Sequence, residues 1–235
     1  MKALAIFYKK IIIYVCLITC FIICLKFITS CCNNTNLSVK EAKVVLNKLE
    51  SIKTSINTDN IASAIKEEGF TDQQICGMTQ YDGGASCYIK GAAEISLWTY
   101  PKRNSYYEKQ GISTSQLLDE RYSDDYLRRK NEHIDILKKN KKDNNSLNRL
   151  KYSFLKVIDE NTYLYSYCEQ IKNNTSKQEG TSYAYYRTIT IKVKPNVLLT
   201  YQYSENNKDG TEKYFYNFTA QAKDDIELLN HTLND

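Results

Sequence analysis

Apolar residues recur at two different spacings along this chain, and the spacing changes near Tyr152. Before that point, three segments carry an apolar residue every three to four positions, the period of a helix with one buried face. Ser38 and Glu41 fit a capping box at the start of the first segment. The helices that this period predicts cover residues 39–56, 59–68 and 114–140.

From Tyr152 onward, apolar and aromatic residues alternate with polar ones, which is the period of a half-buried strand. Turn residues interrupt the alternation at 194–196 and again at 206–210, and a last alternating run follows over 214–218. The pattern predicts an antiparallel meander of about five strands. Residues 221–232 are expected to close the chain as a short helix.

Between the helical segments, residues 75–90 read as a hairpin and residues 93–100 as a strand. Helices followed by strands indicate an α+β fold, with N-terminal helices and one long central helix packed on a C-terminal antiparallel meander. This layout is similar to that of cystatin-like and NTF2-like folds in the order of its elements alone. Residues 38–235 are expected to form a single domain.

An uninterrupted apolar run covers residues 11–25 and follows a segment with three lysines. A membrane-spanning helix needs about 20 apolar residues, whereas the apolar core of an export signal needs roughly 7–15. The run therefore predicts a signal peptide over residues 1–30. The alternative is an uncleaved membrane anchor over residues 3–25.

The four residues Ile28-Thr29-Ser30-Cys31 follow this run. They resemble the lipobox of bacterial lipoproteins, although Ile stands where Leu is commonest and Lys26 interrupts the apolar stretch. The resemblance covers residues 1–31. It implies that Cys31 is acylated, that the signal is cleaved before it, and that residues 31–37 tether the domain to the cell membrane or the outer membrane. The domain would lie in the periplasm or at the cell surface, and Cys32 is a second candidate for the acylated residue.

The remaining cysteines are judged in that exported, disulfide-permissive setting. A four-residue loop over 80–83 would place Cys76 and Cys87 opposite each other on the hairpin, which predicts a disulfide between them. Two cysteines eleven positions apart without a nearby histidine do not make a zinc site, and no metal or cofactor is expected. Cys168 lies in a strand-like run and is expected to be a buried small apolar residue.

The charge balance excludes one class of partner. The chain has 32 Lys and Arg against 27 Asp and Glu, but four of the lysines belong to residues 1–30, which contain no acid. The remainder is nearly neutral, so no nucleic acid partner is expected.

The chain also contains no Gly-x-Ser-x-Gly, phosphate-binding glycine loop or His-Glu-x-x-His motif. His133 lies within an apolar helical stripe and reads as a packed histidine, so we predict that the protein is not an enzyme.

Eleven tyrosines lie between Tyr152 and Tyr216, mostly at strand spacing. They are either ordinary half-buried sheet residues or a recognition surface. Arg187 shares a strand face with two of them, and a cation there must be paired, stacked on a ring or open to a cleft. The candidate binding surface therefore consists of Arg187, Tyr183, Tyr185, Tyr201 and Trp98.

The sequence thus predicts a lipid-anchored envelope protein that binds a ligand or a protein partner. The first alternative is a structural or assembly component of the envelope. A membrane-tethered hydrolase that uses paired carboxylates is the second alternative.

Overall fold

The computed structural model describes residues 36–53, 60–73, 84–100, 105–139, 149–175 and 178–234. The chain separates into two compact units, Met1–Asn36 and Leu37–Asp235, and the fold described below belongs to the second. The predicted signal peptide, with Cys31 and Cys32, lies outside the described residues.

The second unit contains both helices and strands, which confirms an α+β fold. Its helices are α2 (Val39–Asn47), α3 (Ile61–Glu67), α4 (Ser105–Glu108), α5 (Thr114–Lys139), α6 (Glu212–Ala220) and α7 (Ala222–Asn234). Its strands are β1 (Thr71–Gln73), β2 (Gly84–Lys90), β3 (Ala93–Thr99), β4 (Leu150–Asp159), β5 (Thr162–Thr175), β6 (Gln178–Val193) and β7 (Val197–Asn207).

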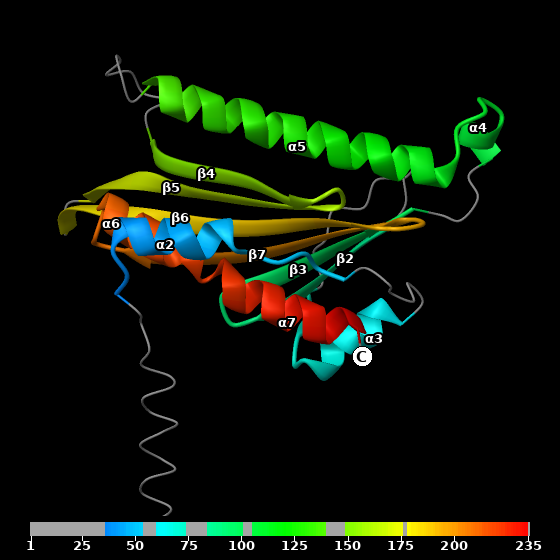
Figure 1. Cartoon of the computed structure of the whole chain (residues 1–235), viewed down its shortest axis with the longest axis horizontal. Coiled ribbons are helices and arrows are strands. Elements are labelled where there is room, and N and C mark those ends of the chain that lie inside the picture. The colour runs from blue at the N-terminus through cyan, green and yellow to red at the C-terminus, as the bar shows by residue number, and fades with distance from the viewer. Residues whose placement is uncertain are drawn as a thin grey trace, which may run out of the picture. The chain divides into compact units, whose positions relative to one another are not determined.

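All of these strands join one seven-stranded antiparallel sheet in the order β1-β2-β3-β7-β6-β5-β4. The predicted meander forms one side of it, and the earlier strands extend it where β3 pairs with β7. The long helix α5 lies on one face, whereas α2, α3, α6 and α7 lie on the other (Figure 1). The main core fills the space between the sheet and this second group of helices.

Helix α2 begins as predicted but ends earlier. The Ser38 side chain accepts from the backbone N–H of Glu41, and the Glu41 carboxylate accepts from the backbone N–H of Ser38. The helix ends at Asn47 rather than near residue 56. Ile52 is still buried, because the irregular segment after α2 is held against α7 by a bond from the Lys53 N–H to the Asn230 side chain (3.0 Å).

The alternating run over 214–218 was expected to be a strand, and this prediction is wrong. The run lies in α6, whose first turn is capped by the Thr211 side chain. Phe215, Phe218 and Thr219 are all buried, and their spacing of three and four residues is that of one helix face. The aromatic residues of this segment fit both the strand period and the helix period, so the sequence alone did not distinguish the two structures.

Strands β1 and β2 pair in antiparallel fashion, but β1 covers Thr71–Gln73 and lies before the range of 75–90 expected for the hairpin. Cys87 lies opposite Gln73, which is three residues before Cys76. Cys87 is disulfide-bonded. Cys76 lies outside the described residues, so its pairing with Cys87 remains a prediction.

Helix α5 confirms the long central helix that was expected over residues 114–140. Leu118 and Ile136 are buried, whereas Leu137 is 54% exposed. Two polar residues of α5 face the sheet as well: Asp125 accepts a hydrogen bond from the Tyr163 hydroxyl, and His133 bonds to Ser153.

Candidate functional site

Arg187, at the centre of the expected binding surface, is buried and fully engaged. Its side chain forms an ion pair with Asp225 of α7 and donates to the backbone oxygen of Phe218 (2.6 Å). The guanidinium also lies over the rings of Tyr203 (5.0 Å) and Phe218 (4.6 Å). With 2% of its surface exposed, Arg187 joins the sheet to the C-terminal helices and is not open to a cleft.

The tyrosines predicted to accompany Arg187 belong to the same interior. The Tyr201 hydroxyl donates to Asp225 (2.9 Å), and the Tyr185 hydroxyl donates to the backbone oxygen of Asp209. Burial raises the pKa of both phenols, so they stay protonated donors. Tyr183 packs its ring against Gly210. The sheet face that carries Arg187 is therefore core, which corrects the expectation of a binding surface there.

Trp98 does not share this face. It pairs in register with Leu198 and packs with Tyr100 (6.4 Å between ring centroids) on the α5 side of the sheet. The Arg121 guanidinium of α5 lies over its ring at 5.3 Å. Trp98 is therefore separated by the sheet from the residues with which it was grouped.

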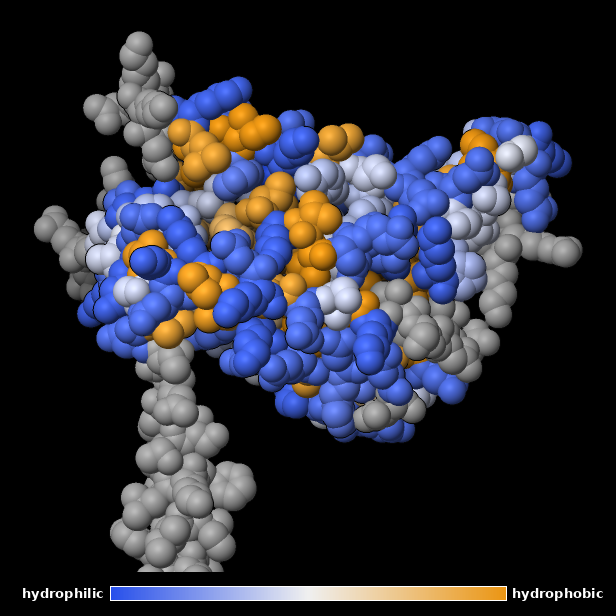
Figure 2. All heavy atoms as spheres, viewed as in Figure 1, coloured by the Kyte–Doolittle hydropathy of each residue, from blue (hydrophilic) through white to orange (hydrophobic). Residues whose placement is uncertain are grey.

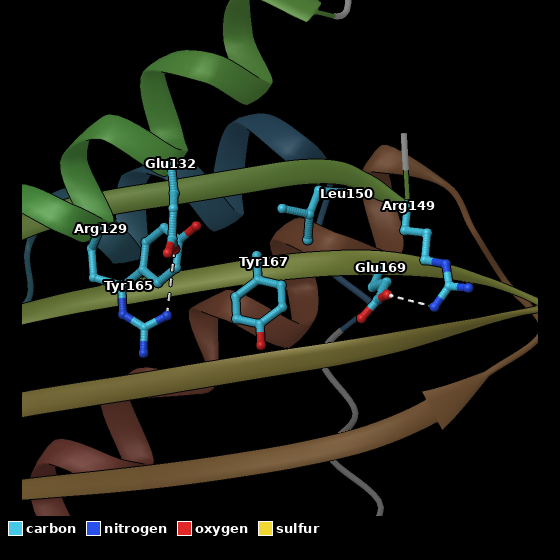
Figure 3. Close-up of a pocket in the computed structure, with 7 residues that line it drawn as sticks. All are labelled: Arg129, Glu132, Arg149, Leu150, Tyr165, Tyr167 and Glu169. Atoms are coloured by element: carbon cyan, nitrogen blue, oxygen red, sulfur yellow. Dashed lines mark hydrogen bonds and ion pairs between the residues drawn. The ribbon is translucent and has the colours of Figure 1, made fainter. Parts of the chain in front are cut away.

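The α5 side of the sheet also carries an open pocket of about 480 Å³. It lies where the C-terminal half of α5 passes over the beginning of β4 and the middle of β5 (Figure 3). A volume of this size is within the range of about 300–1,000 Å³ that small-molecule sites occupy. The lining residues are Arg129, Glu132, Arg149, Leu150, Tyr165, Tyr167 and Glu169.

The charged residues of the pocket form two cation–anion pairs. Arg129 lies 3.5 Å from Glu132, and Arg149 lies 3.9 Å from Glu169. Both separations exceed the 2.7–3.2 Å that is usual for an N–H···O hydrogen bond. Glu132 is shared, since Arg128, which does not line the pocket, lies closer to it at 3.2 Å. Neither pair therefore uses the full hydrogen-bonding capacity of its members.

Tyrosine rings form the inner wall between these pairs. Tyr165 and Tyr167 lie on one face of β5 with centroids 5.5 Å apart, and Tyr186 of β6 stacks on Tyr167 at 4.6 Å. Figure 3 shows Tyr167 between the Arg129–Glu132 pair and the Arg149–Glu169 pair. Burial raises the pKa of Tyr167 to about 12, so its hydroxyl is protonated at neutral pH.

Two buried polar atoms at this wall lack a hydrogen-bond partner within the described part of the chain. They are Nε of Arg129 and the hydroxyl oxygen of Tyr165. The Arg129 guanidinium lies over the Tyr165 ring at 5.1 Å. Burial, and secondly the nearby Glu132 charge, raise the pKa of the Tyr165 phenol. Buried donors are normally paired, so the polar network at this end of the pocket is incomplete.

His133 lies on α5 one residue beyond Glu132 and confirms the packed, hydrogen-bonded interpretation. Its Nδ1 is 2.7 Å from the hydroxyl of the buried Ser153. Burial lowers the pKa of the imidazole below 6.5, which favours the neutral ring.

Cys168 is a buried free thiol as predicted, and burial raises its pKa to about 11. Among the described residues, no cluster of three or more His, Cys, Asp or Glu side chains is placed to hold a metal ion.

The pocket residues were not singled out from the sequence. Arg129 and Glu132 belong to a strongly charged stretch of α5 that resembles a solvated helix face. Tyr165 and Tyr167 belong to the tyrosines at strand spacing, but nothing local indicates that α5 crosses their face of the sheet. The one available signal was the pair of same-face tyrosines followed at the same spacing by Glu169.

Comparisons of the chain with models of protein families, with curated proteins and with solved structures each found no match. The likeness to cystatin-like and NTF2-like layouts is therefore an analogy of element order. Within the ranges that the structure describes, none of the helices has the length and apolar character needed to cross a membrane.

Proposed function

We propose that this chain is a lipid-anchored protein of the bacterial envelope whose α+β domain binds a small ligand in the pocket between α5 and β5. The observation that carries the binding proposal is the pocket itself: two incompletely satisfied ion pairs flank a tyrosine ring in a volume suited to a small molecule. Convergent polar groups around an apolar centre are the usual features of a ligand site.

The anchor is supported by the lipobox-like residues and by how the domain begins. The backbone N–H of Leu37 donates to the Asn217 side chain (2.8 Å), and that side chain donates to the Leu37 carbonyl (2.7 Å). Five residues lie between Cys31 and Leu37, and the six residue-to-residue steps of a fully extended chain span at most about 22 Å. An acylated Cys31 would therefore hold the domain close to the bilayer surface.

A structural or assembly role would favour a broad exposed apolar surface. In the view of Figure 2, apolar residues form small groups separated by polar ones. The exposed large apolar residues also come from several elements: Val44, Ile89, Tyr106, Leu127, Leu137 and Val157. The pocket is the better-defined feature, so we favour ligand binding over assembly.

The test is to fill the pocket. The full chain, purified from membranes in detergent, is screened by saturation-transfer NMR against neutral sugars, sugar acids, amino sugars and dipeptides. We expect at least one of these classes to bind. Leu150→Trp, which adds bulk inside the pocket, should abolish that binding. Val157→Trp also places a tryptophan on β4, but outside the pocket, and should preserve the binding. Absence of binding by every class, or equal binding by both variants, contradicts the proposal.

A further inference from the structure

The pocket holds two arginines and two glutamates, and each end carries one of each. A cationic ligand group would meet Arg129 or Arg149 wherever it met a carboxylate. An anionic group would likewise meet Glu132 or Glu169. Because both signs occur at both ends, the electrostatic arrangement disfavours a ligand with a net charge.

A hydroxyl group suits such a pair better than a charge does. It has one O–H donor and two acceptor lone pairs, whereas a carboxylate only accepts and an ammonium only donates. It can donate to the glutamate and accept from the arginine of the same pair without separating them. The 3.5 Å and 3.9 Å separations leave donors and acceptors of both pairs available for this exchange.

Tyr167 and Leu150 form the less polar centre between these two ends (Figure 3). The ligand that matches this order has an apolar middle and hydroxyl groups around its rim. A sugar ring has this composition, since C–H groups cover its faces and hydroxyls surround its edge.

We propose that the pocket binds an uncharged saccharide. Glu132 and Glu169 accept hydrogen bonds from its hydroxyls, Arg129 and Arg149 donate to them, and the ring lies against Tyr167. This inference rests on the proposed function, because it names the ligand class of the same pocket.

The decisive experiment compares matched sugars on the full chain in detergent. Neutral disaccharides (lactose, maltose, cellobiose and chitobiose) are titrated beside glucuronate, glucosamine and glycylglycine, with binding followed by saturation-transfer NMR. We expect at least one neutral disaccharide to bind at least about tenfold more tightly than any charged or zwitterionic probe, because a charged group here loses about one hydrogen bond to an ionised partner. Tighter binding of glucuronate, glucosamine or glycylglycine at the pocket would overturn this inference and leave the proposed function standing. Failure of every probe would overturn both.

Single substitutions then locate the contacts. Glu132→Gln and Glu169→Gln keep the side-chain shape, remove the charge and should each weaken disaccharide binding about tenfold. Glu160→Gln, on the turn after β4, is the matched control and should leave binding unchanged. Unchanged sugar affinity in both pocket variants would exclude the proposed contacts.

Discussion

Arg187 of β6 and Asp225 of α7 form an ion pair inside the protein, where both residues are almost completely buried. Arg187 also bonds the Phe218 carbonyl, and Asp225 also accepts from Tyr201. The pair therefore connects the centre of the sheet to both C-terminal helices. Removing one partner leaves a charge in the interior without compensation.

Substitution of Arg187 by methionine should therefore be costly. We expect Arg187→Met to lower the free energy of unfolding by about 3–5 kcal/mol, measured by urea denaturation. Lys223→Met breaks an exposed pair with Glu227 on the same helix and should change stability by less than about 1 kcal/mol. Similar small effects for both variants would show that the buried pair does not hold the helices to the sheet.

Gly210 is a second position at which we expect a substitution to lower stability. A Cβ atom there would overlap the ring of Tyr183, so Gly210→Ala must displace that ring or the turn before α6. We expect a loss of about 1–3 kcal/mol in the free energy of unfolding. Gly84→Ala is the control, because a Cβ at Gly84 meets no atom within 4 Å. A stable Gly210→Ala variant would mean that Tyr183 packs differently.

His133 should make the protein sensitive to acid. Its pKa is lowered in the folded state by burial, so the unfolded chain binds more protons as the pH falls through 6.5. The free energy of unfolding should therefore decrease in this window and then level off below the folded-state pKa. His133→Gln should remove that decrease, measured as the difference between the two proteins at each pH. Parallel pH profiles would assign the sensitivity to other groups.

The disulfide prediction concerns Cys76 and Cys87. Unreduced peptide mapping should recover these two residues as one linked species, and reduction should cost about 2–3 kcal/mol of stability. Cys168 is the internal control: as a buried thiol with a raised pKa, it should react with iodoacetamide only after unfolding. Recovery of Cys87 linked to Cys32 would disprove the predicted pairing.

The predicted lipid anchor can be tested by mass spectrometry of the intact chain. Chain purified from native membranes should begin at Cys31 and carry acyl groups. Cys31→Ser should accumulate with its signal uncleaved, whereas Cys32→Ser should mature normally. A wild-type chain that still begins at Met1 would support the alternative anchor over residues 3–25.

Periodicity predicted the α+β class, α5 and the strands of the meander because each of those segments shows a single period. It failed at 214–218, where Tyr214, Tyr216 and Phe218 alternate while Phe215 and Phe218 fit a helix. Only the Thr211 cap and the buried face of α6 decide between the two. Local pattern was insufficient there because tertiary packing selects the period.

The candidate site was misplaced for a related reason. Arg187 was recognised as unusual on an apolar strand, but its partner Asp225 is 38 residues away and joins it only through the fold. The pocket depends on α5 crossing β5, which brings Arg129 beside Tyr165. Such crossings follow from three-dimensional packing, and no spacing along the chain encodes them visibly.

The two hydrogen bonds between Leu37 and Asn217 have a mechanical consequence. In the lipid-anchored protein that we propose, a pull on the tether reaches Leu37 before it reaches the first turn of α2. Because Asn217 bonds both backbone polar groups of Leu37, part of this load passes to α6. Phe215 and Phe218 bury one face of α6 in the core, so the interior shares a load that α2 would otherwise bear alone.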